Sequence, residues 1–345
     1  METSAYAAMS AGAPLEPHTI ERRDLRPHDV LIDIKYSGIC HSDIHQAREE
    51  WFTSIFPMVP GHEIAGIVRE VGSDVTAFSP GDRVGVGVFV ETCMECDNCK
   101  AGLENYCVKG FVPTYNGKSY DGEVMYGGYS SAIVVDDHYV LRIPEGMELD
   151  VAAPLLCAGI TTYSPLREWK AGPGKKVGIM GLGGLGHMGL KHAVAMGADV
   201  TLISHSPSKE EDAKRLGAHN FLLLSDADAM KEQAMTFDLI VNTVSAPIDL
   251  DPAINLLKTD GTMAYVGLPD KPLEMNIFGL NSQRRRIAGS NIGGIPETQE
   301  MLDFCAEHGY ASDIELINAD QINEAWERVV NSDVRYRFVI DASTF

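Results

Sequence analysis

Four cysteines within a short segment have the spacing of a metal site. Two residues separate Cys93 from Cys96 and Cys96 from Cys99, and seven more precede Cys107. Thiolates at this spacing can surround one tetrahedral zinc ion, because short loops bring four soft ligands together without long-range folding. Chance clustering or a pair of disulfides are the alternatives. A four-thiolate site has no open position, so we expect a structural zinc that does no chemistry.

Two of the remaining cysteines and one histidine are candidate ligands of a second metal. Cys40, His62 and Cys157 together offer two thiolates and an imidazole, which can hold a zinc whose fourth position is open to a substrate. Each of the three could equally be an ordinary buried core residue. The three residues are far apart along the chain, and the sequence alone does not show that they meet in the fold.

A glycine-rich segment predicts a dinucleotide site. Gly181, Gly183 and Gly186 form G-x-G-x-x-G between a predicted strand and a predicted helix. Such a turn lets the backbone approach a pyrophosphate, which then faces the unpaired N–H groups of the helix N-terminus. A glycine-rich turn without a ligand is the alternative. The predicted phosphate-binding residues are Gly181, Leu182, Gly183, Gly184, Leu185 and Gly186.

The end of the next predicted strand favours NADP(H) over NAD(H). NAD sites usually have a carboxylate here for the adenosine ribose, whereas this chain has Ser204, His205, Ser206 and Lys209. Hydroxyls and an ammonium group can bind a 2′-phosphate, and no carboxylate repels it. Capping of the following helix is an alternative or additional role for these residues.

Around these sites, the residue pattern predicts a β-rich part followed by alternating strands and helices. Strands separated by helices of this length predict right-handed crossovers and a parallel sheet. The first part has predicted strands at 30–36, 64–71 and 82–90. The second has predicted strands at 176–180, 199–203, 220–224, 238–243 and 262–266, with helices at 185–196 and 208–216. A late helix at 296–309 puts Cys305 in the core, and a last strand is predicted at 336–341.

Composition restricts the possible functions. The 345 residues are 45% hydrophobic and 22% charged, as in folded globular proteins, and the net charge of −21 disfavours nucleic acid as a partner. No apolar stretch of about 18 residues predicts a membrane span, and the N-terminus lacks signal-peptide features. Because the cysteines group as metal ligands, we expect a reducing, cytoplasmic location.

Several motifs together resemble those of the zinc-dependent medium-chain alcohol dehydrogenases, and most of all their cinnamyl alcohol dehydrogenase branch. They are Gly38-Ile-Cys-His-Ser-Asp-Ile-His-Gln46, Pro57-Met-Val-Pro-Gly-His-Glu63, the four-cysteine segment, the glycine-rich segment and Ile203-Ser-His-Ser. The resemblance implies an α/β chain with a GroES-like catalytic domain at 1–153 and 295–345. A doubly wound, parallel-sheet Rossmann domain would occupy 154–294.

The same resemblance implies particular ligands and partners. Cys40, His62 and Cys157 would bind the catalytic zinc, with Glu63 next to the metal and able to enter its coordination in some states. NADP(H) would be the preferred cofactor, giving two zinc ions and one dinucleotide per chain. The chain would form a homodimer through its nucleotide-binding domains.

Three residues near Cys40 are predicted to act in the reaction. The Ser42 hydroxyl would take the alcohol proton, which passes by way of the cofactor ribose to His45 and then to solvent. Asp43 would accept the far ring N–H of His62, although an ordinary loop cap is an alternative. His41 is expected beside the cofactor or exposed.

An apolar pocket is expected between the zinc and the cleft of the two domains. Its candidate residues are Trp51, Phe52, Phe111 and Val112. Plant cinnamyl enzymes commonly have a tryptophan near the last two, where this chain has Gly110-Phe-Val-Pro113. The sequence therefore favours a broad reductase of aromatic and medium aliphatic aldehydes, interconverting them with primary alcohols. The alternatives are an NAD-dependent zinc polyol dehydrogenase and a non-catalytic NADPH-binding protein.

Overall fold

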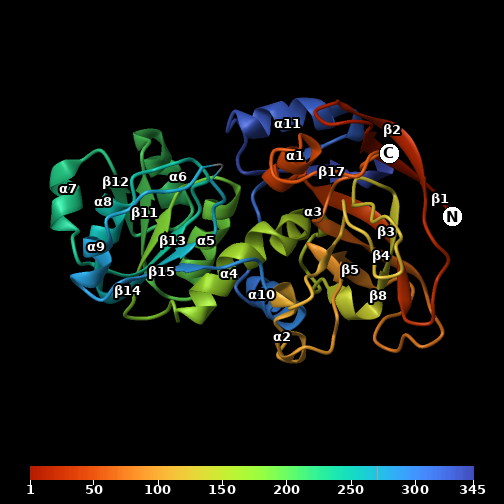
Figure 1. Ribbon diagram of the computed structural model, residues 1–345, viewed down its shortest axis with the longest axis horizontal. Helices are drawn as coiled ribbons and strands as arrows, with labels where there is room; N and C mark the ends of the chain where they lie inside the picture. Colours follow the sequence, from red (N-terminus) through yellow and green to blue (C-terminus); the bar gives the residue numbers. More distant parts are fainter. Residues whose placement is uncertain (270) are drawn as a thin grey trace. The chain divides into compact units, whose positions relative to one another are not determined.

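The chain folds into two compact units, described here from a computed structural model that covers residues 1–269 and 271–345 (Figure 1). The first unit comprises Met1–Ile160 and Gly293–Phe345, and the second comprises Thr161–Ile292. Both chain termini therefore belong to the first unit. Within the described ranges, no helix combines the length and the apolar character needed to cross a membrane.

The first unit is built on a seven-stranded, mostly antiparallel sheet. Its order is β16-β17-β3-β4-β5-β9, and β8 also pairs with β3. Strand β3 (Asp29–Gly38) lies centrally because Val30, Ile32 and Ile34 are all buried and it pairs with three other strands. The other strands of this unit are β1 (Glu2–Ala8), β2 (Leu15–Glu21), β4 (Ile64–Val71), β5 (Arg83–Val86), β6 (Phe89–Glu91), β7 (Val112–Pro113), β8 (Ala132–Asp136), β9 (Leu141–Arg142), β16 (Ile314–Ile317) and β17 (Arg337–Asp341).

Short helices connect these strands, and two longer ones come from the C-terminal segment. Helix α10 (Ile295–Glu307) buries Met301, Leu302 and Cys305 on one face, as the sequence predicts for Cys305. Helix α11 (Ile322–Val330) packs against α1 (His41–Ala47) (Figure 1). The other helices are α2 (Asp97–Lys100), α3 (Leu149–Ala152) and α4 (Ala158–Glu168), within which the first unit ends.

The second unit contains a six-stranded parallel sheet of order β12-β11-β10-β13-β14-β15. The chain adds strands on one side of β10 up to β12 and then on the other side from β13, so the switch point of the sheet, where doubly wound folds bind ligands, lies between β10 and β13. The strands are β10 (Lys176–Met180), β11 (Asp199–Ser204), β12 (Asn220–Leu223), β13 (Phe237–Asn242), β14 (Leu257–Tyr265) and β15 (Arg286–Gly289). The helices are α5 (Gly184–Ala195), α6 (Glu210–Arg215), α7 (Ala227–Glu232), α8 (Asp251–Asn255) and α9 (Ile277–Asn281). The predicted α/β class with a parallel Rossmann sheet is thereby confirmed.

The division between the units differs from the predicted boundary at 153/154. Residues 154–160 belong to the first unit, because the 3-10 helix Ala153–Leu156 is buried and packs against β3, β4 and β5. Cys157 directly follows this 3-10 helix. It therefore lies in the same unit as Cys40 and His62.

Candidate active site

Three segments of the first unit bring four candidate metal ligands together. Cys40 precedes α1 at the end of β3, while His62 and Glu63 directly precede β4. Strands β3 and β4 are antiparallel neighbours with Ser37 opposite Ile64, so their adjoining loops meet at one end of the sheet. Cys157 directly follows the buried 3-10 helix Ala153–Leu156. All four are buried, and their ligand atoms lie within 4.8 Å of one another.

The donor set and its spacing fit zinc. The Sγ atoms of Cys40 and Cys157 are 3.9 Å apart. Two thiolates bound at about 2.3 Å in a tetrahedral zinc site would lie about 3.8 Å apart. The imidazole of His62 completes a set of nitrogen and sulfur ligands, which zinc prefers among divalent ions in proteins.

Asp43 fixes the orientation of His62. The carboxylate is fully buried, and its Oδ1 accepts from the His62 Nδ1–H at 3.0 Å and from the Gly61 N–H at 3.1 Å. Its Oδ2 accepts from the Cys40 N–H at 3.0 Å. Burial lowers the pKa of His62, but the charge and hydrogen bond of Asp43 outweigh it and raise that pKa well above its ordinary value. With Nδ1 held by Asp43, the other ring nitrogen is available to a metal.

Of the two thiols, Cys40 loses its proton easily and Cys157 keeps its own. Their mutual hydrogen bond, helped by His62, lowers the pKa of Cys40 well below its ordinary range. The same hydrogen bond and burial raise the pKa of Cys157 well above that range. A metal that binds both as thiolates must therefore displace the proton of Cys157.

Glu63 is held by a buried arginine. Its Oε1 accepts a hydrogen bond from Arg337 of β17, which also donates to the Ile39 carbonyl at 2.8 Å. Its Oε2 is buried and has no partner among the described residues. Burial raises the pKa of Glu63 to about 7, although Arg337 acts in the opposite direction. A buried carboxylate oxygen without a partner fits a position next to a cation.

The residues of the predicted proton relay lie on α1. The Cys40 Sγ lies 3.5 Å from the Ser42 Oγ, so Ser42 is at the metal site. His45 is partly exposed, forms a hydrogen bond with Glu50 through Nδ1, and stacks on Trp51 with ring centroids 4.8 Å apart. The ring of His41, which is exposed, also stacks on that of His45, with centroids 5.8 Å apart.

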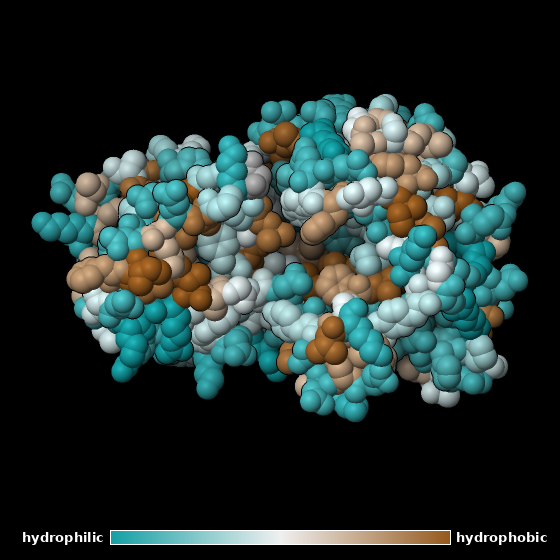
Figure 2. All heavy atoms as spheres, viewed as in Figure 1, coloured by the Kyte–Doolittle hydropathy of each residue, from teal (hydrophilic) through white to brown (hydrophobic). Residues whose placement is uncertain are grey.

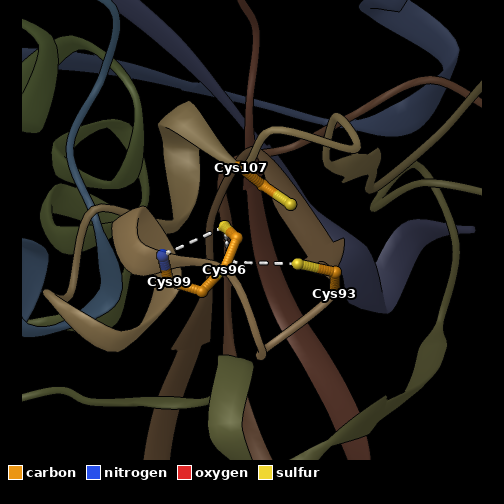
Figure 3. Close-up of side chains that lie close together, drawn as sticks. All are labelled: Cys93, Cys96, Cys99 and Cys107. Carbon is orange, nitrogen blue, oxygen red and sulfur yellow. Dashed lines mark hydrogen bonds between the residues drawn. The ribbon is translucent and has the colours of Figure 1, made fainter.

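The four-cysteine segment forms a second, separate cluster in the first unit. In Figure 3 the side chains of Cys93, Cys96 and Cys107 point toward one another. The ligand atoms of all four cysteines lie within 4.8 Å of one another. Cys99 Sγ lies 3.9 Å from that of Cys93 and 3.5 Å from that of Cys96, which caps α2. Backbone N–H groups of Val108 and Cys99 lower the pKa of Cys96 to about 6, as suits a thiolate ligand. This geometry also fits tetrahedral zinc, with no further ligand needed.

The glycine-rich segment lies at the carboxyl end of β10, where the second unit would bind a dinucleotide. Gly181 has a φ of +94°, and a Cβ on Gly186 would collide with the Gly181 carbonyl. Only glycine fits this turn, after which α5 begins at Gly184. Leu182 is buried and Leu185 half-buried, so both side chains help to anchor the loop.

The predicted phosphate contacts lie just beyond β11. Ser204 ends the strand and is buried, and its Oγ accepts from the Ser206 N–H at 3.1 Å. His205 is exposed, while Ser206 and Lys209 are half-buried. The Ser206 and Ser208 hydroxyls are 2.8 Å apart. A short 3-10 helix at Pro207–Lys209 leads into α6, so these residues also form its entry.

The predicted pocket residues lie in two places within the first unit. Trp51 is half-buried against His45, whereas Phe52 is 73% exposed. Phe111 is half-buried against Phe89, and Val112 is buried in the pairing of β6 with β7.

Sequence reasoning missed four residues that surround the metal site. Arg337 holds Glu63, and Tyr115 stacks on His62 with ring centroids 5.7 Å apart. Tyr129 donates to Asp43 and accepts from Trp326. These residues lie far from the ligands in sequence and belong to no recognisable motif, so the sequence contains no signal for them.

Comparison with known proteins agrees with this architecture. The family "Alcohol dehydrogenase GroES-like domain" matches residues 26–145, and the family "Zinc-binding dehydrogenase" matches residues 184–307. The chain is 61% identical to NADP-dependent alcohol dehydrogenase C 1 of Mycolicibacterium smegmatis, over 99% of this chain and 98% of that protein. It is 56% identical to aldehyde reductase YahK of Escherichia coli, over 100% of this chain and 99% of that protein.

A solved structure of a related protein has the same fold. The crystal structure of CAD from Helicobacter pylori complexed with NADP(H) matches with a TM-score of 0.92 and 43% identity, over 99% of each chain. A GroES-like domain with two cysteine-containing zinc sites, joined in one chain to a Rossmann fold, defines a zinc-dependent dehydrogenase. The chain belongs to the zinc-containing medium-chain alcohol dehydrogenases, in the branch of NADP-dependent alcohol dehydrogenase C and cinnamyl alcohol dehydrogenase-like proteins.

Proposed function

We propose that this chain is an NADP(H)-dependent zinc alcohol dehydrogenase and aldehyde reductase that interconverts primary alcohols and aldehydes. The observation that carries the proposal is the buried Cys40, His62, Glu63 and Cys157 cluster in a chain that also has a dinucleotide fold. The similarity to an NADP-dependent alcohol dehydrogenase and an aldehyde reductase supports the same activity.

The chain's own residues would hold the reactants and move one proton. Bound zinc would supply a Lewis acid for the substrate oxygen, and the nicotinamide would carry the hydride. Ser42, 3.5 Å from the Cys40 sulfur, would accept the alcohol proton and pass it toward His45, which is partly open to solvent. Asp43 would keep His62 in the tautomer that binds metal.

Cys93, Cys96, Cys99 and Cys107 would hold the structural zinc. Their closed four-sulfur arrangement supports a role in the fold of this segment. The resulting complement is two zinc ions and one NADP(H) per chain.

The preference for NADP(H) would come from the residues that follow β11. Ser204, His205, Ser206 and Lys209 offer hydroxyl, imidazole and ammonium groups to a 2′-phosphate. The glycine loop from Gly181 to Gly186 would hold the pyrophosphate at the start of α5. We propose a catalytic domain at 1–153 and 295–345 and a nucleotide-binding domain at 154–294. Cys157, just beyond the boundary, would still bind the catalytic zinc.

The substrate pocket would include Trp51, Phe52, Phe111 and Val112. Their aromatic and aliphatic side chains suit aromatic and medium aliphatic aldehydes. We therefore expect broad specificity instead of strict use of cinnamyl substrates.

A homodimer formed through the second unit is the proposed assembly. Strand β15 is at the edge of its sheet and pairs with β14 alone among the described strands. Next to its start, α9 exposes Ile277 (54%) and Phe278 (74%), and Figure 2 shows hydrophobic side chains gathered in this region. Light scattering on the wild type and on Phe278→Glu tests this, since a monomeric wild type would contradict it.

Reduced cysteine ligands support a cytoplasmic location.

Turnover with a panel of substrates tests the function. NADPH and NADH are each supplied with benzaldehyde, cinnamaldehyde and medium aliphatic aldehydes, and NADP and NAD with the matching alcohols and a polyol. We expect aldehyde reduction at least tenfold faster, by kcat/KM, with NADPH than with NADH. Turnover of the polyol with NAD alone, or no turnover with any pair, would contradict the proposal.

A further inference from the structure

The buried carboxylate of Asp43 has a fourth hydrogen-bond donor besides Cys40, Gly61 and His62. The hydroxyl of Tyr129 donates to Asp43 Oδ2 at 3.2 Å. Each carboxylate oxygen then accepts two hydrogen bonds, which matches the roughly four acceptor positions of an ionised carboxylate. Asp43 and Tyr129 are fully buried, so water does not supply a replacement donor, and the other hydroxyl that interacts with Asp43 is that of the buried Tyr115.

Tyr129 is itself held by a residue from the C-terminal segment. The Trp326 Nε1–H of α11 donates to the Tyr129 hydroxyl at 3.4 Å. With that hydrogen bond accepted, the Tyr129 proton is directed to Asp43. The result is a buried chain of hydrogen bonds that runs from Trp326 through Tyr129 and Asp43 to the far ring nitrogen of His62.

The backbone also ties Tyr129 to the segment that carries His62. The Tyr129 N–H donates to the Pro60 carbonyl, and the Gly128 N–H donates to the Gly61 carbonyl, both at 2.9 Å. Gly61 has a φ of +104°, and a Cβ there would lie 2.6 Å from the Tyr129 ring. The close approach of ring and loop therefore depends on glycine at position 61.

From this geometry we infer that Tyr129, supported by Trp326, is a positioning residue for the catalytic zinc. It acts through Asp43, which it holds in the place where the carboxylate fixes the His62 imidazole. The inference rests on the proposed zinc site. Without the Tyr129 hydroxyl, Asp43 loses one of four donors and can turn away from His62, so the imidazole is less well aimed at the metal.

Zinc retention under a chelator tests this role. Zinc-loaded wild type and Tyr129→Phe are incubated with EDTA, and the zinc remaining per chain is followed with time. Cysteines freed of metal are labelled with iodoacetamide and located by mass spectrometry. Since loss of a partner of a metal ligand costs about 10–100-fold in affinity, we expect Tyr129→Phe to lose one of two zincs about tenfold faster. Labelling should appear at Cys40 and Cys157, while the four-cysteine cluster stays protected.

Two further variants keep the test decisive. Trp326→Phe retains an aromatic ring but lacks the N–H donor, and it should release the same zinc about threefold faster even if Tyr129→Phe fails to fold. Tyr139→Phe is the control, because it also deletes a buried hydroxyl, one that accepts from the Thr92 N–H at 2.7 Å. In that control, Cys40 and Cys157 should stay as protected as in the wild type.

The outcomes separate the inference from the proposed function. A wild type that binds no zinc at Cys40 and Cys157 would overturn the zinc site itself. Wild-type rates of zinc release in both Tyr129→Phe and Trp326→Phe would overturn the positioning role alone. Simultaneous loss of both zincs with a lowered melting temperature would do the same, because it indicates a general role in stability.

Discussion

Glu104 links the four-cysteine segment to helix α10, and its removal should destabilise the first unit. The side chain is buried, and its Oε2 accepts from the Ile295 N–H at 3.1 Å. Ile295 is the first residue of the 13-residue helix, which lacks a side-chain cap of its own. The other carboxylate oxygen lies 3.1 Å from His138 Nε2. Glu104 therefore caps a helix that begins 191 residues later in the chain.

The expected cost of Glu104→Ala follows from these contacts. A lost cap costs about 1 kcal/mol, and a negative charge at a helix N-terminus contributes up to about 1 kcal/mol. The one buried methylene that alanine lacks adds about 0.8 kcal/mol. The free energy of unfolding should fall by about 3 kcal/mol. Glu104→Gln retains the acceptor and the packing, so it should lose about 1 kcal/mol.

Urea denaturation, followed by the fluorescence of the tryptophans, measures this loss as a lower midpoint at unchanged slope. Glu95→Ala is the matched control, because Glu95 lies in the same segment but is exposed and forms a surface ion pair with Lys109. It should leave the midpoint unchanged. If Glu104→Ala were within 1 kcal/mol of the wild type, the capping argument would be refuted.

Three further substitutions test the proton relay, the cofactor preference and a charge of the second unit. Ser42→Ala should lower turnover at least tenfold at constant zinc content, and undiminished turnover would remove Ser42 from the relay. Lys209→Ala should raise the KM for NADPH about tenfold and leave that for NADH unchanged; an unaltered NADPH/NADH preference would refute the phosphate site. Burial raises the pKa of Asp238, but the Lys176 N–H and the Lys258 ammonium outweigh it and hold that pKa below its ordinary value. The ionised Asp238 carboxylate therefore stabilises the fold above about pH 4, and this effect is lost as the pH falls through the lowered pKa. The free energy of unfolding of Asp238→Asn should be about 1 kcal/mol below that of the wild type from about pH 5 to 9, and the difference should shrink at lower pH. A gap that widens on acidification would contradict this sign.

Local patterns were sufficient to predict the Rossmann unit. Strand β10 and the start of β11 agree with the prediction. A short apolar run followed by a glycine-rich turn and then by helical periodicity is typical of a strand, a turn and a helix. The predicted strand at 82–90 is instead divided into β5 and β6, since the alternation of valines does not reveal a break in pairing. The fold class and the class of enzyme are confirmed by the comparisons.

Long-range contacts explain what the sequence could not predict. Tyr129 and Arg337 lie 86 and 274 residues from the acidic groups that they hold. No spacing rule connects residues so far apart. The compact units also divide later than the predicted domains, because residues 154–160 look like the start of the second unit in sequence but pack with the first. Motifs thus identified the metal-ligand candidates, whereas only the fold reveals what orients them.

Metal analysis combined with turnover of Cys157→Ser tests whether Cys157 holds the catalytic zinc. We expect two zinc ions per chain in the wild type and one in the variant. NADPH-dependent reduction of benzaldehyde should fall at least a thousandfold, because the Lewis acid of the site is lost. Cys305→Ser, at a buried cysteine outside both clusters, is the matched control and should retain two zinc ions. Full turnover by Cys157→Ser with a single zinc per chain would show that zinc at this site is not needed for the reaction.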